Sequence, residues 1–225
     1  MDKETLYQLK KTILFMDFDL DEIKKIFKDI SLRIIHYKKG EILFLEGSDC
    51  TGIGIVLSGK VEINKGATIG KKILITTIHE GDMFAEAIVF SSGHKYPATV
   101  EASEDTKVAF ISRQNIISLC SLYPSFIENF MEILSNKIFI LNSKLSLLSM
   151  KSLRQKIAFY LLKESKPLKS KNYISISKQE LSLELGVERP SLSRELIKMK
   201  DEGLLELEGK KIIVNDIEAL GEIIE

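Results

Sequence analysis

Hydrophobic positions divide the chain into a strand-rich first half and a helical second half. From about residue 32 to 111, short runs of β-branched and aromatic residues alternate with glycines. The clearest runs are 33–37, 42–45, 54–57, 60–63, 72–76 and 107–111. Many short strands at this spacing predict an antiparallel sandwich or barrel. A small helical segment, roughly residues 6–27, precedes them.

A long helix is predicted between the two halves, over residues 123–150. Seven apolar residues recur along it at alternating intervals of four and three: Ile127, Met131, Leu134, Ile138, Leu141, Leu145 and Leu148. This is an unbroken heptad seam. The helix could lie on its own β-domain instead. However, a strict 3.5-residue period suits two helices wound around each other better than one straight helix on a sheet. The seam therefore predicts a parallel homodimer.

Residues 177–200 predict two short helices joined by a tight turn. Ser177 and Glu180 have the spacing of a capping box at the start of the first helix. Gly186 supplies the sharp turn, because glycine takes positive φ without penalty. Pro190 is tolerated in the first turn of the second helix, where N–H groups have no helical partner. Leu192, Leu196 and Met199 form its buried stripe.

The opposite face of this second helix predicts binding in a DNA major groove. Arginine can clamp guanine with two hydrogen bonds, and serine can contact several base edges. Two strand-like runs, 203–207 and 212–214, flank a basic turn and predict a wing that touches phosphate. A capped surface hairpin without a DNA role is the alternative. The candidate DNA-binding residues are Lys178, Gln179, Arg189, Pro190, Ser191, Ser193, Arg194 and Lys210.

Charge is unevenly placed in a chain of 225 residues whose formal net charge is zero. Residues 151–200 hold twelve Lys and Arg against five Asp and Glu, whereas residues 201–225 hold two against eight. The excess of positive charge thus coincides with the predicted helix-turn-helix, as expected for a partner with a phosphate backbone. No apolar run is long enough for a membrane span, and the polar N-terminus resembles no signal peptide, so we expect a cytoplasmic protein.

The remaining candidate chemistry is sparse. Cys50 and Cys120 are isolated, and the three histidines, His36, His79 and His94, form no H-x-H pair. A metalloenzyme built on a cupin-like barrel is conceivable, but scattered histidines make a multi-histidine metal site hard to assemble. The sequence also lacks a G-x-S-x-G nucleophile motif. We therefore predict a protein that is not an enzyme and has no metal ligands.

Several motifs carry a resemblance to a known family. They are Lys39-Gly40-Glu41, Phe44-Leu45-Glu46-Gly47, Val56 to Val61, Gly81 to Glu86, Pro97 to Val100, Leu185 to Arg194 and Asp201 to Leu204. In this order they resemble the Crp/Fnr family of bacterial transcription regulators, over essentially the whole chain. The forms of residues 95–99 and 189–194 are most similar to its HcpR/Dnr-like branch, which responds to nitrosative stress.

The resemblance implies an α+β protein in three parts. Residues 1–122 would form an antiparallel β-barrel like the cyclic-nucleotide-binding jelly roll, and residues 123–150 a coiled-coil dimerisation helix. Residues 151–225 would form a winged helix-turn-helix. The implied partners are a palindromic double-stranded DNA operator, a second copy of the chain and RNA polymerase, with no membrane.

The effector pocket implied by the resemblance comprises Phe84, Ala85, Glu86, Tyr96, Pro97, Ala98 and Thr99. Members that bind cyclic nucleotides have an F-G-E segment and an arginine ten residues after the glutamate; here these positions hold Phe84-Ala85-Glu86 and Tyr96. A phenol cannot replace a fixed cation against phosphate. Cyclic AMP is therefore disfavoured, and the alternative is a cyclic-nucleotide-responsive regulator that uses a different phosphate partner.

The cofactor stays open at this point. The iron–sulfur branch of the family needs an N-terminal cysteine cluster, and residues 1–30 contain no cysteine. Similarity to the nitrosative-stress branch favours haem with nitric oxide among the candidate signals. The possible axial ligands are the three histidines, Met83 and Cys50, and none of them lies in a decisive motif.

Overall fold

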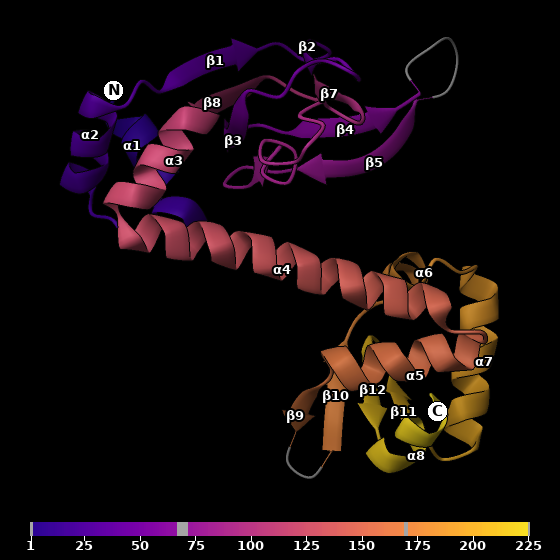
Figure 1. Ribbon diagram of the computed structural model, residues 1–225. Coiled ribbons are helices and arrows are strands. Elements are labelled where there is room, and N and C mark those ends of the chain that lie inside the picture. The colour runs from indigo at the N-terminus through magenta and orange to yellow at the C-terminus, as the bar shows by residue number, and fades with distance from the viewer. Residues whose placement is uncertain (1, 67–71, 169–170, 225) are drawn as a thin grey trace. The chain divides into compact units, whose positions relative to one another are not determined.

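Two four-stranded antiparallel sheets form the β-roll of the first half of the protein (Figure 1). The computed structural model describes residues 2–66, 72–168 and 171–224. One sheet has the strand order β1-β8-β3-β6 and the other β2-β7-β4-β5. The strands are β1 (Arg33–Tyr37), β2 (Ile42–Phe44), β3 (Gly52–Ser58), β4 (Val61–Lys65), β5 (Ile73–Ile78), β6 (Met83–Phe84), β7 (Thr99–Ala102) and β8 (Thr106–Ser112).

Apolar side chains from both sheets fill the interior of the roll. The Phe84 ring lies directly against Gly54, where an added Cβ would come within 2.2 Å of the ring. Gly54 is therefore needed for close approach rather than for a turn. Helices α1 (Lys3–Lys10), α2 (Leu20–Asp29) and α3 (Arg113–Leu122), with the 3₁₀ turn η1 (Ile13–Phe15), complete this unit. Phe15 is fully buried and packs against Phe18, Phe27 and Phe126.

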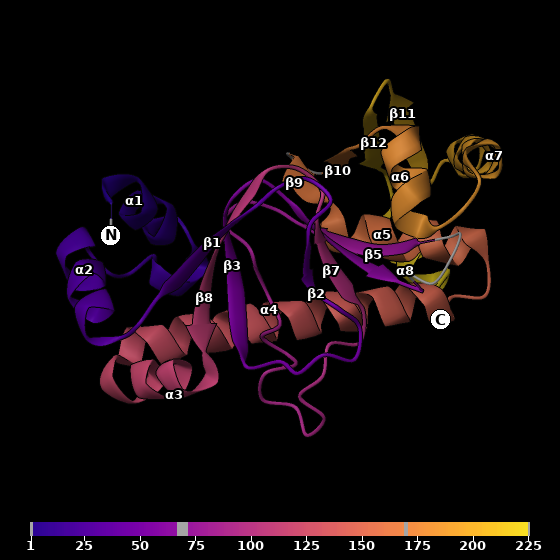
Figure 2. The same cartoon turned by 90° about the horizontal axis from the view of Figure 1, so that it is seen from above.

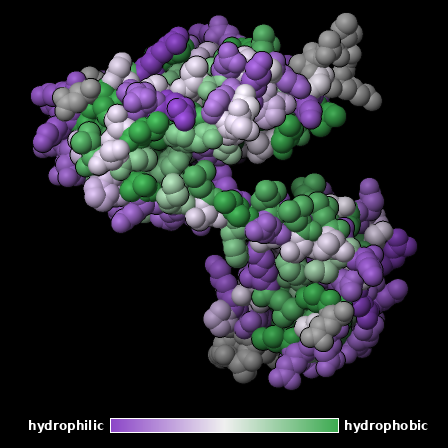
Figure 3. Space-filling view, in the orientation of Figure 1, coloured by the Kyte–Doolittle hydropathy of each residue, from purple (hydrophilic) through white to green (hydrophobic). Residues whose placement is uncertain are grey.

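Helix α4 (Pro124–Ser149) is the long helix predicted from the heptad pattern. It packs on its own β-domain through a stripe that includes Phe126, Phe130 and Ile133. Most of the heptad seam lies off this stripe: Ile138, Leu141, Leu145 and Leu148 are 55–72% exposed, whereas Leu134 is partly buried against the domain core. Figure 3 shows hydrophobic residues gathered along the course of α4. The helix thus uses one face for its own domain and leaves a second apolar face uncovered.

The second compact unit begins within α4, at Ile138, and carries the winged helix-turn-helix. Its helices and strands are α5 (Leu153–Glu164), β9 (Lys166–Leu168), β10 (Lys171–Ser175), α6 (Lys178–Leu185), α7 (Arg189–Asp201), β11 (Leu205–Glu208), β12 (Lys211–Val214) and α8 (Ile217–Glu222). The sheet order is β11-β12-β10-β9. Figure 2 shows α7 nearly end-on beside α6, so the two helices cross steeply.

The α+β architecture confirms the predicted fold class, with differences in detail. The strands β6, β7, β9 and β10 and the helices α3 and α8 were not among the predicted elements. Strand β6 has only two residues, which is too short to show a pattern. Strands β9 and β10 contain lysine and other polar residues, so they show no period-2 hydrophobic pattern. Among the described residues, no helix is both long and apolar enough to cross a membrane.

Candidate DNA-binding face and effector site

The turn between α6 and α7 has the local geometry that the sequence predicts. The Glu180 N–H donates to Ser177 Oγ at 3.1 Å, and the Ser177 N–H donates to a Glu180 carboxylate oxygen at 2.8 Å. These hydrogen bonds lower the pKa of Glu180 below its ordinary value. Gly186 ends α6 in the left-handed conformation, with φ of +63°. The capping box and the glycine turn are therefore both confirmed.

Helix α7 is held by one face and presents the other to solvent. Leu192, Leu196 and Met199 are fully buried, as predicted. Arg189, Pro190 and Arg194 are exposed, and Ser191 and Ser193 are half-buried near them. The predicted DNA-reading residues of α7 thus share an accessible surface rich in arginine and hydroxyl groups. This is the chemistry that reads base edges and phosphates.

A side-chain clamp that sequence reasoning missed fixes α7 to α5. Arg154 Nε donates to Glu195 Oε1 at 2.7 Å, and its two terminal nitrogens donate to the two carboxylate oxygens of Glu202, each at 2.7 Å. The two terminal nitrogens of the Arg154 guanidinium thus pair with the one carboxylate of Glu202, and these hydrogen bonds raise the pKa of Arg154. Glu202 belongs to a quoted family motif, but its partner lies 48 residues away, beyond the range of any local pattern.

The wing tip lies next to the start of α6. The Ile176 N–H donates to the Lys210 carbonyl at 2.8 Å, so the turn between β11 and β12 is tied to the residue that precedes the α6 cap. Gly209 allows this turn with φ of +62°. Lys210 is exposed at the tip, and Lys178 and Gln179 open α6. The structure therefore brings together the wing lysine and the two polar residues predicted at the first helix.

Most residues of the predicted effector pocket are buried side chains of the β-roll. Phe84, Ala85, Tyr96, Ala98 and Thr99 are buried, whereas Pro97 is exposed. The Tyr96 ring stacks on Phe44 with ring centroids 4.4 Å apart. Burial raises the pKa of Tyr96 far above its ordinary value, so its hydroxyl stays protonated. The position that holds an arginine in cyclic-nucleotide-binding members is thus part of an aromatic core.

Ala85 adopts a backbone conformation that alanine rarely takes. Its φ is +69°, in the left-handed region. Glycine enters this region freely, whereas a residue with a Cβ is destabilised there by about 1–2 kcal/mol. The alanine in the F-A-E segment therefore keeps a glycine-like backbone at a cost in stability, and such strain tends to occur at functional segments.

Lys137 ties this segment to helix α4, and sequence reasoning missed it. Its ammonium group donates to Glu86 Oε1 at 2.6 Å and to the Met83 carbonyl at 3.1 Å. The buried carboxylate of Glu86 therefore has a cation beside it. The other oxygen of Glu86 is buried without a hydrogen-bond partner among the described residues. The sequence did contain a signal for this contact: Lys137 follows Ile133 by four residues, so it lies on the same face of α4 as the buried stripe.

The candidate haem ligands do not converge on a pocket. His36, His79 and His94 are all exposed, and the Cys50 thiol donates to the Gly52 carbonyl at 3.3 Å. The described residues contain no group of three or more His, Cys, Asp or Glu that could hold a metal ion. His36 borders a pocket of about 210 Å³, and neither Met83 nor Cys50 lines that pocket. The described residues therefore do not bring two of the candidate ligands to one described cavity.

Comparison with known proteins agrees with this two-unit architecture. The family model "Cyclic nucleotide-binding domain" matches residues 34–123, and the model "Crp-like helix-turn-helix domain" matches residues 155–223. The chain belongs to the Crp/Fnr family. It is a DNA-binding transcription regulator that carries a domain of the cyclic-nucleotide-binding type.

Similar proteins include two curated regulators. The "CRP-like cAMP-activated global transcriptional regulator" of Mycobacterium tuberculosis is 25% identical, covering 84% of this chain and 87% of that protein. The "Transcriptional activator protein FnrA" of Stutzerimonas stutzeri is 29% identical, covering 84% and 79%. Among solved structures, the catabolite activator protein of Thermus thermophilus matches with a TM-score of 0.53 at 24% identity, covering 95% of this chain and 98% of that one. DNR from Pseudomonas aeruginosa matches with a TM-score of 0.51 at 22% identity, covering 99% of each chain. These two structures support the fold alone.

Proposed function

We propose that this regulator is a homodimer that reads a palindromic DNA site and is controlled by an effector in its β-roll. The observation that carries the proposal is the exposed apolar seam of α4. A monomer would leave Ile138, Leu141, Leu145 and Leu148 in water, and these residues have the heptad spacing that a second α4 would cover. A dimer through this seam also supplies two copies of α7 for two half-sites.

Two residues divide the work of DNA recognition in this proposal. Arg194 is exposed on α7 and contacts a base edge, most favourably guanine, in each half-site. Lys210 at the wing tip contacts phosphate and carries no sequence information. Arg154 acts indirectly, because it holds Glu195 on α7 and Glu202, the residue that caps the end of α7, and so sets the orientation of that helix.

Lys137 offers a route from the β-roll to the dimer helix. Its contacts with Glu86 and the Met83 carbonyl join the 83–86 segment to α4. An effector that favours one arrangement of this segment would favour one arrangement of α4, and hence of the two copies of α7. The segment and α4 are thus in direct contact, as this control requires.

Cyclic AMP does not fit the proposal, although some relatives are named as cAMP-activated. Tyr96 supplies no cation for a phosphate, and its ring is buried and stacks on Phe44. We therefore propose a different effector. An interaction with RNA polymerase stays a prediction from the family resemblance.

A comparison of specific and random DNA tests the readout. A target duplex is first selected from a random library with the wild-type protein. Arg194→Ala should weaken binding to this duplex by about 1–3 kcal/mol per half-site, with much less effect on random DNA. Lys210→Ala, the matched control, should weaken both duplexes alike and lower the salt dependence. Equal losses on both duplexes for Arg194→Ala would refute the assigned role. A single chain bound per duplex would refute the dimer.

A further inference from the structure

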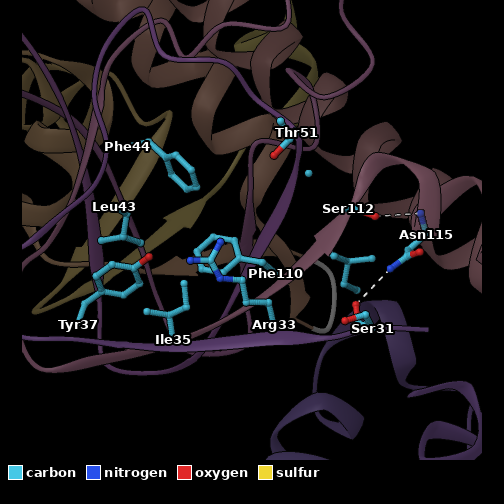
Figure 4. Close-up of a pocket in the computed structure, with 12 residues that line it drawn as sticks. Ser31, Arg33, Ile35, Tyr37, Leu43, Phe44, Thr51, Phe110, Ser112 and Asn115 are labelled. Atoms are coloured by element: carbon cyan, nitrogen blue, oxygen red, sulfur yellow. Dashed lines mark hydrogen bonds between the residues drawn. The ribbon is translucent and has the colours of Figure 1, made fainter. Parts of the chain in front are cut away.

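A cavity of about 380 Å³ opens in the β-roll beside the predicted effector segment (Figure 4). It is lined by β1, β2, β3, β8 and the start of α3. Arg33, Ile35 and Tyr37 line it from one face of β1, because successive strand side chains alternate between faces. Its volume falls in the range of about 300–1,000 Å³ that is usual for small-molecule sites. None of the seven predicted effector residues is part of its lining.

The cavity has apolar walls and one charged group. Ile35, Leu43, Phe44 and Phe110 form the walls. Arg33 is the charged residue of the lining, which contains no Asp or Glu. Among the residues that the structure describes, no carboxylate lies within ion-pair distance of Arg33. The site therefore combines apolar surface with an unpaired cation.

Tyr37 adds a hydroxyl group near this cation. Figure 4 shows the Tyr37 hydroxyl and the Arg33 guanidinium directed into the same space. Burial raises the pKa of Tyr37, so the hydroxyl keeps its proton and can donate a hydrogen bond. A guanidinium and a phenol O–H together form a donor pair suited to a carboxylate.

We propose that this cavity binds a small organic anion, an aryl or short alkyl carboxylate, and that it is the effector site of the protein. The carboxylate pairs with Arg33 and accepts a hydrogen bond from Tyr37. The apolar body lies against Leu43, Phe44 and Phe110. A neutral ligand of the same shape would leave Arg33 without an anion.

Phe44 connects this cavity to the predicted effector segment. The centroid of its ring lies 5.7 Å from the ring centroid of Phe110, 4.4 Å from that of Tyr96 and 6.4 Å from that of Phe84. Phe84 lies next to Met83 in the segment that Lys137 joins to α4. A ligand pressed against Phe44 therefore acts on the chain of contacts that reaches the dimer helix. This part of the inference rests on the proposed regulatory function, whereas ligand binding itself does not.

Calorimetry on the full-length protein, without DNA, tests the site. The probes are phenylbutyrate and octanoate, with phenylbutyramide as the neutral match. We expect both anions to bind with one site per chain, and the amide to bind at least about tenfold more weakly. Arg33→Gln should weaken anion binding by a similar factor, and Arg33→Lys should restore part of it. Lys24→Gln, which removes an exposed cation of α2, is the matched control and should bind like the wild type.

Three outcomes would overturn parts of the inference in distinguishable ways. Absence of heat with both anions at about 1 mM would refute the site. Equal affinity for the amide, or for Arg33→Gln with an unchanged melting temperature, would refute the role of Arg33. Binding that leaves operator affinity unchanged would confirm the site but refute its coupling to DNA. A wild type that binds ligand but no DNA would refute the proposed function alone.

Discussion

Replacement of Leu141 by lysine tests whether the exposed seam of α4 forms the dimer. Leu141 lies near the middle of the exposed part of the seam, and 58% of its surface is accessible in the single chain. Its α4 face is separate from the stripe that packs on the β-domain, so the substitution should leave the protomer folded. The expected result is a folded monomer that no longer binds the operator specifically.

The magnitude follows from the exposed fraction. Full burial of a leucine side chain contributes about 1.5–3 kcal/mol. Since 58% of Leu141 is exposed in the single chain, covering this exposed part in the dimer contributes about 1–2 kcal/mol for each protomer. A dimer contains two copies, so the change removes about 2–4 kcal/mol, which corresponds to a dimer dissociation constant about 30- to 1,000-fold larger. Two ammonium groups brought together in an apolar seam weaken association further.

Sedimentation analysis at micromolar concentration measures this change. Leu122→Lys is the matched control, because Leu122 is 66% exposed but lies at the end of α3, outside the seam. This control should stay dimeric and bind DNA as the wild type does. Dimeric Leu141→Lys, or a monomeric wild type, would refute the assignment of the interface. Loss of the dimer with unchanged operator affinity would refute the need for two copies of α7.

Further predictions concern the segment around Glu86, the α6 cap and the effector. Lys137→Met should lower the melting temperature of the β-domain, because the buried Glu86 carboxylate loses its cation. Adding Glu86→Gln should restore the melting temperature, whereas additive losses in the double variant would argue against the ion pair. Hydrogen bonds lower the pKa of Glu180, so its stabilising contribution is present above its ordinary value of 4.5 and disappears as pH falls through the folded-state pKa. Glu180→Gln should lack this acid-dependent loss in pH-dependent melting curves, and identical pH slopes would contradict the cap. Titration with cyclic AMP should give no heat, and titration with haem no stoichiometric Soret band; micromolar affinity for either would contradict the residue assignments.

Local patterns were sufficient to predict the parts of the protein that depend on neighbouring residues. The Ser177 cap, the Gly186 turn and the buried stripe of α7 each involve residues within a few positions of one another. The exposed seam of α4 is likewise a property of one helix, read from its period. The order of the strand-rich half, the long helix and the helix-turn-helix was also read from these patterns, and the resemblance to a known family added the functions expected of each part.

Predictions about the effector site were weaker for a physical reason. They were carried by motifs in residues 84–99, and motifs do not show which side chains fill a pocket. In the structure, Tyr96 stacks on Phe44, 52 positions earlier in the sequence, and leaves the open space on the β1 side of the roll. Strand pairing decides this arrangement, because a one-residue change of register would turn Arg33 and Tyr37 to the other face.

The sequence by itself determined the two helices and the turn of the helix-turn-helix, the two strands of the wing, the apolar seam and the residues that α7 presents. Only the tertiary structure decided the partners of the charged groups. Lys137 reaches Glu86 across 51 residues and Arg154 reaches Glu202 across 48. Such pairs depend on how sheets and helices pack, since the attraction between two opposite charges becomes stronger as packing excludes water from them. No local pattern records that packing, so the contacts that join the β-roll to α4 and α5 to α7 emerge only from the folded chain.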